Sequence, residues 1–233
     1  MDDFKCHTAT KKGLKILTEE LRRSARELGL VLNENKCGFY SGGRQVQDGE
    51  DEEPSFLPEV RRGYKYLGLE QLERDTKNNF ETIEEKIKQL TSKICKSQLT
   101  TGQKAKLFNS TVVSSAIYVM GNIYPDEKRA STLKRCRDLD KEVRKILVET
   151  NLKGRTTSNA HIYIPASIGG MGLWSIELEA EIQYIRRGIY IKSHPEMKET
   201  MKMYEKLQQA GWRNPLGDHD AILGKYGCPN ITV

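Results

Sequence analysis

Two adjacent carboxylates, Asp2 and Asp3, are the residues whose types and spacing most directly suggest chemistry in this chain. Carboxylate oxygens are the ligands that hard divalent cations prefer. Acids close to a terminus are also common without any chemical role, because chain ends are usually solvated and tolerate charge. The pair alone therefore indicates either part of a metal site or an ordinary charged terminus.

The other reactive side chains form no recognisable site in the sequence. The five cysteines are odd in number, scattered and never in a C-x-x-C pair, which favours reduced thiols over a zinc module and predicts an intracellular protein, nuclear or cytoplasmic. The four histidines lack ligand-like spacing, and "GGMGL" lacks the Lys-Ser/Thr ending of a phosphate-binding loop. We interpret Trp174 and Trp212 as packing residues rather than as platforms for bases.

Charge is the bulk property that points to a partner. The 233 residues carry a net charge of +6, and residues 77–160 contain 17 Lys and Arg against 9 Asp and Glu. A basic block favours a polyanion such as nucleic acid, although a set of solvated helix faces would have the same composition. No apolar run approaches the length of a membrane span, so we expect no membrane partner.

The first third of the chain alternates between helix and strand patterns. Apolar residues at three- and four-residue spacing predict a helix over 11–28, which Gly29 would end. The stretch "LGLVLNENKCGFYSG" predicts two short strands around a polar turn, and "RRGYKYLGLEQ" predicts further extended structure. The acidic, proline-flanked "DGEDEEPSFLP" between them is interpreted as a surface loop.

From Phe80 onward the pattern predicts helices. Three apolar stripes predict three successive helices, the last of them starting near Pro125, and two more helices are expected over 177–192 and 195–210. "HIYIPASIGGMGLWS" is interpreted as a strand-like piece and a glycine-rich turn, and the residues after 210 as a tail. The stripes are Phe80, Ile83, Ile87, Leu90 and Ile94; Ala105, Phe108, Val112, Ala116 and Val119 or Met120; and Leu133, Leu139, Val143, Ile146 and Leu147.

Four segments in order carry a resemblance to a known family: "MDDFKCHTATKKGLKILTEELRRSARELGLVLNENKCGFY", "GYKYLGL", the helices beyond it and "IYIPASIGGMGLWSIE". Together they resemble the downstream half of a reverse transcriptase of a non-LTR retrotransposon, in the branch that carries a restriction-like endonuclease. The first is similar to the stretch from the Y-x-D-D turn through the palm helix to the N-x-x-K segment. The others resemble the primer-grip hairpin, the thumb and the segment after the thumb.

This resemblance implies an α+β fold, with a partial polymerase palm followed by a mostly helical, thumb-like domain. Residues 1–75 would be the second half of the palm with the primer-grip hairpin, 76–160 the thumb, and 161–233 a post-thumb helical segment and tail. The implied partners are an RNA template, a DNA primer and the upstream polymerase segment of the same transposable element.

The resemblance also implies roles for single residues. Asp2 and Asp3 would be catalytic ligands of Mg²⁺ in an intact polymerase, which uses two metal ions to activate the primer hydroxyl and stabilise pyrophosphate. Lys36 of "NENK" would act on the reacting phosphates, unless it is an ordinary turn lysine. The implied primer-grip residues are Tyr64, Lys65, Tyr66, Leu67 and Gly68. The expected phosphate-binding cations of the thumb are Lys86, Lys93, Lys96, Lys104, Lys106, Lys134, Arg135, Lys141 and Arg144.

The sequence departs from the family by lacking the fingers and the separate catalytic aspartate expected upstream of Asp2. We therefore expect this chain to be inactive by itself as an RNA-directed DNA polymerase. One hypothesis is a portion of a reverse transcriptase that works within a longer protein. The alternative is a decayed or co-opted retroelement fragment that binds nucleic acid or a protein without catalysis.

Overall fold

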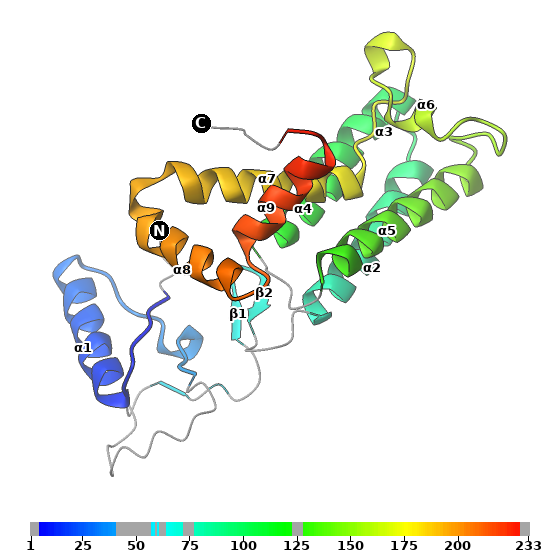
Figure 1. Cartoon of the computed structure of the whole chain (residues 1–233). Helices are drawn as coiled ribbons and strands as arrows, with labels where there is room; N and C mark the ends of the chain where they lie inside the picture. The colour runs from blue at the N-terminus through cyan, green and yellow to red at the C-terminus, as the bar shows by residue number, and fades with distance from the viewer. Residues whose placement is uncertain are drawn as a thin grey trace. The chain divides into compact units, whose positions relative to one another are not determined.

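The chain divides into two compact units, unit 1 (Met1–Arg74) and unit 2 (Asp75–Val233). The computed structural model describes residues 5–40, 57–58, 60, 64–71, 77–122 and 128–228, and helices predominate among them (Figure 1). The boundary between the units lies one residue before the expected boundary after residue 75, and the expected boundary after residue 160 lies inside unit 2.

Unit 1 begins with helix α1 (Lys11–Glu27), in the place predicted from its leucine spacing. Thr10 caps the helix, because its hydroxyl accepts a 3.0 Å hydrogen bond from the backbone N–H of Gly13. Gly29 follows the helix with a φ of 72°, the left-handed conformation that glycine adopts most readily at helix ends. The short 3₁₀ turn η1 (Glu34–Lys36) comes next.

The first of the two strands predicted in "LGLVLNENKCGFYSG" is wrong, because residues 30–32, which precede the predicted turn, form no strand. These residues have no regular secondary structure and no ladder pairing among the described residues, and Val31 is 93% exposed. A strand needs a neighbour that pairs with its backbone, so apolar, β-prone side chains do not make one by themselves. The pairing that does form is at Phe39, whose N–H donates to Pro58 at 3.2 Å and whose C=O accepts from Val60 at 2.8 Å.

Unit 1 ends in a hairpin of β1 (Tyr64–Tyr66) and β2 (Leu69–Gln71), which pair antiparallel with Tyr66 opposite Leu69. Phe39 and Leu69 are the buried apolar side chains among the described residues of this unit, and the leucines of α1 at 14, 17 and 21 are half-buried. The described part of unit 1 therefore buries little apolar surface.

The described residues of unit 2 form helices joined by loops, without a strand, and α7 is the central element. Helix α7 packs against α4, α5 and α9, and α2 packs against α5 and α4 (Figure 1). The elements are α2 (Lys77–Lys96), α3 (Thr101–Leu107), the π-helical turn η2 (Phe108–Val113), α4 (Ser114–Asn122), α5 (Arg129–Glu149), α6 (Ala160–Tyr163), the 3₁₀ turn η3 (Ala166–Ile168), α7 (Ile176–Ser193), the 3₁₀ turn η4 (Pro195–Met197), α8 (Lys198–Gln209) and α9 (Pro215–Lys225). None of the helices in the described ranges has both the length and the apolar character needed to cross a membrane.

The predicted apolar stripes form the core of unit 2. All but Leu90 and Ile146 are buried, and full burial of a large apolar side chain contributes about 1.5–3 kcal/mol. The second stripe runs without a break through α3, η2 and α4, so the π-helical turn leaves its apolar face on the core side. The buried members are Phe80, Ile83, Ile87, Ile94, Ala105, Phe108, Val112, Ala116, Val119, Met120, Leu133, Leu139, Val143 and Leu147.

Two predictions for the second half of unit 2 are wrong. The strand-like "HIYIP" is the short helix α6 and the start of a loop that folds back, with the N–H of Leu173 donating to the C=O of Ile162 at 3.0 Å. Gly170 lies so close to this segment that a Cβ atom there would be 1.9 Å from the carbonyl oxygen of Ile164. The expected tail contains α9, a helix with buried Leu216.

Candidate nucleic-acid interface

The carboxylate pair Asp2 and Asp3 lies outside the described residues. Lys36 is described: it is exposed and ends the η1 turn, where its N–H donates to the C=O of Asn33 at 2.9 Å. Among the residues that the structure describes, no group of three or more His, Cys, Asp or Glu side chains could hold a metal ion.

The segment expected to be the primer grip is a hairpin with a two-residue turn. Leu67 and Gly68 form the turn with φ angles of 49° and 81°, and a turn with two positive φ angles matches the twist of paired strands. Glycine adopts this conformation freely, whereas a leucine there costs about 1–2 kcal/mol. Leu67 is 55% exposed, so burial does not explain the residue. The side chains of Tyr64, Lys65 and Tyr66 lie outside the described part of the structure.

Six of the nine cations expected in the thumb have exposed side chains, and five of these six form no ion pair with the described residues. The five come from three helices: Lys86, Lys93 and Lys96 of α2, Lys106 of α3 and Lys134 of α5. On α2, Lys86 and Lys93 are seven residues apart, which is close to two turns, so they lie on one face about 10 Å apart along the axis.

The other four cations are engaged within the protein. Lys104 donates to the backbone C=O of Cys95 at 2.7 Å and so caps the end of α2. Arg135 forms a 2.8 Å ion pair with Glu84, and its guanidinium lies over the ring of Phe80. Lys141 pairs with Asp138 at 2.7 Å, and Arg144 donates to the hydroxyl of Tyr163 at 2.8 Å. Arg135 and Arg144 thus join α5 to neighbouring elements.

The exposed cations of α2 and α3 belong to an acid-free stretch. Residues 86–125 contain six lysines and no Asp or Glu. The exposed face of α5 differs, because acids alternate with its lysines and Glu142 pairs with Lys145 at 2.6 Å. The sequence count over residues 77–160 did not separate these two regions. The positive charge that remains available therefore concentrates on α2 and α3.

Sequence reasoning missed three buried carboxylates that organise unit 2. Asp140 of α5 is 4% exposed and accepts hydrogen bonds from the backbone N–H groups of Ile176 and Glu177, at 2.9 and 3.1 Å. Burial raises the pKa of Asp140, while the hydrogen bonds that it accepts from Ser175 and the two backbone groups act against the rise. The carboxylate holds the start of α7 against α5, and no local signal identifies it because its partners are more than thirty residues away.

The second and third carboxylates fix α9. Asp218 is 2% exposed and pairs with Arg213 at 2.7 Å and with Arg129 of α5 at 3.1 Å. Glu181 of α7 is also 2% exposed, and it accepts from Lys225 at 2.5 Å and from the hydroxyl of Tyr226. Buried charges of this kind require partners. We assign both carboxylates to structure.

The two tryptophans correct a sequence interpretation. Trp174 is 51% exposed and Trp212 is 69% exposed, so neither is a packing residue of the kind expected. The backbone around Trp174 is nevertheless held in place, because Asn109 of η2 accepts from the N–H of Trp174 at 2.9 Å and donates to the C=O of Gly172 at 2.8 Å. The loop before α7 is therefore fastened to η2 by one amide side chain.

Comparison with known proteins adds no relative to this geometry: no family model, no curated protein and no solved structure matches the chain.

Proposed function

We propose that this chain is part of the RNA-directed DNA polymerase of a non-LTR retrotransposon, and that unit 2 contacts the primer–template through its phosphates. The observation that carries the proposal is the exposed lysine surface of α2 and α3, defined by Lys86, Lys93, Lys96 and Lys106, within a stretch that contains no acid. Ammonium groups bind phosphates as point charges, without reading the bases. Binding by this surface would depend on salt and little on sequence.

The polymerase part of the proposal has separate support. The four segments that resemble the family occur in order, and the one similar to the primer grip is an antiparallel hairpin with a two-residue turn. The strained Leu67 at its tip is a backbone outlier of the kind that clusters at functional sites. In the proposed role the tip contacts the primer strand.

Catalysis is proposed for the intact polymerase. Asp2 and Asp3 offer carboxylate oxygens, the donor type that Mg²⁺ prefers, and would be the residues of this chain that hold the ion. When bound, the ion would stabilise the charge on the transferred phosphoryl group. Lys36 would neutralise charge on the reacting phosphates. The separate aspartate of the family belongs to the upstream polymerase segment that the resemblance implies as a partner.

The low burial in unit 1 fits such a partner. Three leucines on one face of α1, at positions 14, 17 and 21, are half-buried, and Val31 is almost fully exposed. Apolar side chains that are left partly exposed in this way are available to pack against another segment. We propose that this face of unit 1 meets the rest of the palm.

The test of the nucleic-acid surface is a salt titration with a labelled RNA–DNA hybrid of mixed sequence. For duplex DNA, log K falls with log salt by about 0.9 per neutralised phosphate, so four to six contacts would give a slope of roughly −4 to −5. Reversing Lys86, Lys93 and Lys96 to Glu should make the slope shallower by about three, since each lost phosphate contact removes about one.

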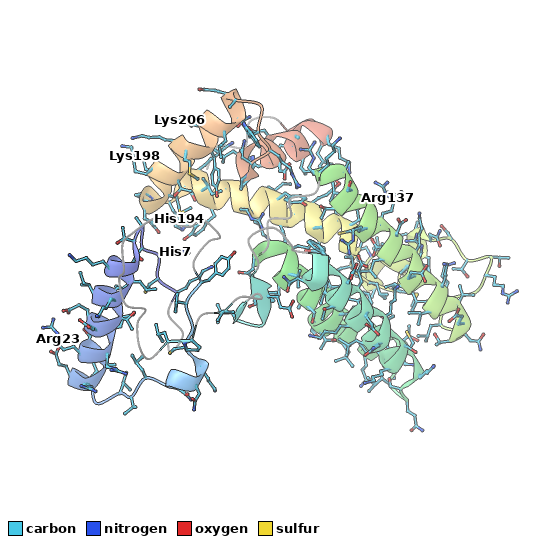
Figure 2. All side chains as sticks on the ribbon, turned by 90° about the horizontal axis from the view of Figure 1, so that it is seen from below. His7, Arg23, Arg137, His194, Lys198 and Lys206 are labelled. Atoms are coloured by element: carbon cyan, nitrogen blue, oxygen red, sulfur yellow. The ribbon has the colours of Figure 1, made fainter. Side chains whose placement is uncertain are left out.

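A matched control comes from α8, where Lys198, Lys202 and Lys206 are exposed and spaced by one turn (Figure 2 labels the first and last). Lys202 pairs with Glu199 at 2.8 Å, so this face is partly neutralised. Reversing these three lysines changes net charge by the same amount but should leave most of the slope intact. Equal losses in the two triple variants, or an affinity that salt does not change, would contradict the proposed surface.

A further inference from the structure

His219 is the most deeply buried histidine among the described residues, and it lies where α9 meets α7. Its side chain is 1% exposed. The ring packs on Gly188 of α7 so closely that a Cβ atom there would be 2.1 Å from Cδ2 of His219. Helices α7 and α9 make the most extensive helix–helix contact of unit 2, so the ring lies in the main contact that holds α9 in place.

The hydrogen-bonding partners of His219 determine which protonation state of the ring fits between α7 and α9. Its Nδ1 lies 3.1 Å from a carboxylate oxygen of Asp220. A carboxylate only accepts, so Nδ1 donates and the neutral ring carries its lone pair on Nε2. Nε2 is buried and has no hydrogen-bond partner in the described part of the chain. A proton on Nε2 would place a charged donor where no acceptor meets it.

Charged groups reach the ring from both helices. Lys192 of α7 forms a 2.9 Å ion pair with Asp220 of α9, and both act on His219. Burial lowers the pKa of His219 below its usual value, Lys192 lowers it further, and Asp220 works in the opposite direction. The net direction is downward, so docked α9 favours the neutral ring.

We propose that His219 makes the contact between α7 and α9 an acid-sensitive latch, in which the neutral ring holds α9 and protonation of Nε2 releases it. The latch stands on the α7–α9 geometry and does not depend on the proposed nucleic-acid binding. Release would expose Leu216, Ile222 and Leu223, which are buried in the docked helix. The interactions of Asp218 and Glu181 oppose release and keep the latch closed when the ring is neutral.

The direction of the pH effect follows from linkage. A released His219 titrates near the ordinary value of about 6.5, whereas the docked ring has a lower pKa. Between these two values the released state binds more protons. Docking is therefore strongest above about pH 6.5 and weakens as the pH falls, by up to about tenfold per pH unit, until the pH reaches the pKa of the docked ring.

Hydrogen exchange of the full chain at about pH 7.5 and about pH 5.5, corrected for intrinsic exchange, tests the latch across the range in which histidine titrates. In the wild type, peptides covering α9 should lose protection at the lower pH, relative to peptides of α2 and α5. In His219→Asn the amide keeps a donor toward Asp220 but cannot titrate, so this pH-dependent loss should disappear. The same pH dependence in wild type and variant would overturn the proposal.

A second measurement keeps the test decisive if His219→Asn does not fold. In an NMR titration of the wild type, the His219 ring should have its midpoint below about 6.5. The backbone amide signals of residues 215–226 should shift with the same midpoint. A midpoint at or above the ordinary value, or α9 amides that ignore the titration, would rule out the latch.

Discussion

Asp140 of α5 accepts a 2.7 Å hydrogen bond from the hydroxyl of Ser175, the residue that caps the start of α7. Ser175 in turn accepts from the backbone N–H of Leu178 at 3.3 Å. Two side chains 35 positions apart therefore share the unpaired N–H groups at the start of α7, and the negative charge of Asp140 lies at the positive end of the helix dipole. This link aligns α7, against which α4, α5 and α9 all pack.

Replacing Asp140 by Asn should destabilise unit 2. The amide offers one acceptor oxygen in place of two, and its NH₂ group would face a backbone N–H. We expect a loss of about 1–3 kcal/mol in the free energy of unfolding, the usual penalty for leaving a buried donor unsatisfied. Urea unfolding followed by circular dichroism measures it. Asp138→Asn on the same helix is the control, because Asp138 pairs with Lys141 at the surface; a similar loss in both variants would refute the assigned role of Asp140.

Arg213→Met should weaken unit 2 much more than Arg137→Met. Both arginines bind a carboxylate through two nitrogens. Asp218, the partner of Arg213, is 2% exposed, whereas Arg137, which Figure 2 labels, is an exposed residue paired with Glu177. Breaking a buried ion pair leaves an uncompensated charge, so we expect Arg213→Met to lower the free energy of unfolding by about 3 kcal/mol. This is the low end of the range for buried pairs, because Arg129 remains as a second partner of Asp218. Thermal and urea unfolding of the two variants compare them directly, and equal effects would contradict this reasoning.

Gly170→Ala should disrupt the loop before α7. Its Cβ atom would meet the backbone of Ile164, which cannot move as a flexible side chain would, and overpacking of this kind costs about 1–3 kcal/mol or more. Gly102→Ala in α3 is the opposite case, since nothing lies within 4 Å of its Cβ position. Removing a helical glycine there should stabilise the protein by about 0.4–1 kcal/mol. Melting temperatures that move in the same direction for both variants would contradict the loop geometry.

Four of the five cysteines should separate into two reactivity classes. Burial, with help from Asp140 and other acids, raises the pKa of Cys136 to about 12, and burial also raises the pKa of Cys95. The thiolate is the reactive form, so both should resist iodoacetamide at neutral pH until the protein unfolds. Exposed Cys6 and Cys228 should react readily. Mass spectrometry after timed alkylation gives the order, and early labelling of Cys136 in folded protein would show that its surroundings are more open than described.

Part of the proposed nucleic-acid interface was predictable from the sequence. The stretch of lysines without acids can be read directly from the sequence. The helical stripe that buries Ile83, Ile87 and Ile94 leaves Lys86 and Lys93 exposed. The engagement of Arg135 and Arg144 within the protein was not predictable, because their partners Glu84 and Tyr163 come from other elements. An ion pair between helices depends on how the helices pack, which local spacing does not reveal.

By itself, the sequence determined the helices whose signals are local. The stripes of α2, α3–η2–α4 and α5 and the Gly29 stop depend on neighbours within a few residues, and they lie where they were predicted. The predicted start of the third helix near Pro125 lies outside the described residues, and α5 is described from Arg129. Only the tertiary structure decided α9, whose Gly217 and Gly224 disfavour a helix. Its stability comes from burial and from distant partners of Asp218 and Lys225. The same reason separates the predicted strand at 30–32 from the hairpin at 64–71: a strand exists only where another backbone pairs with it, and a two-residue turn supplies that partner locally.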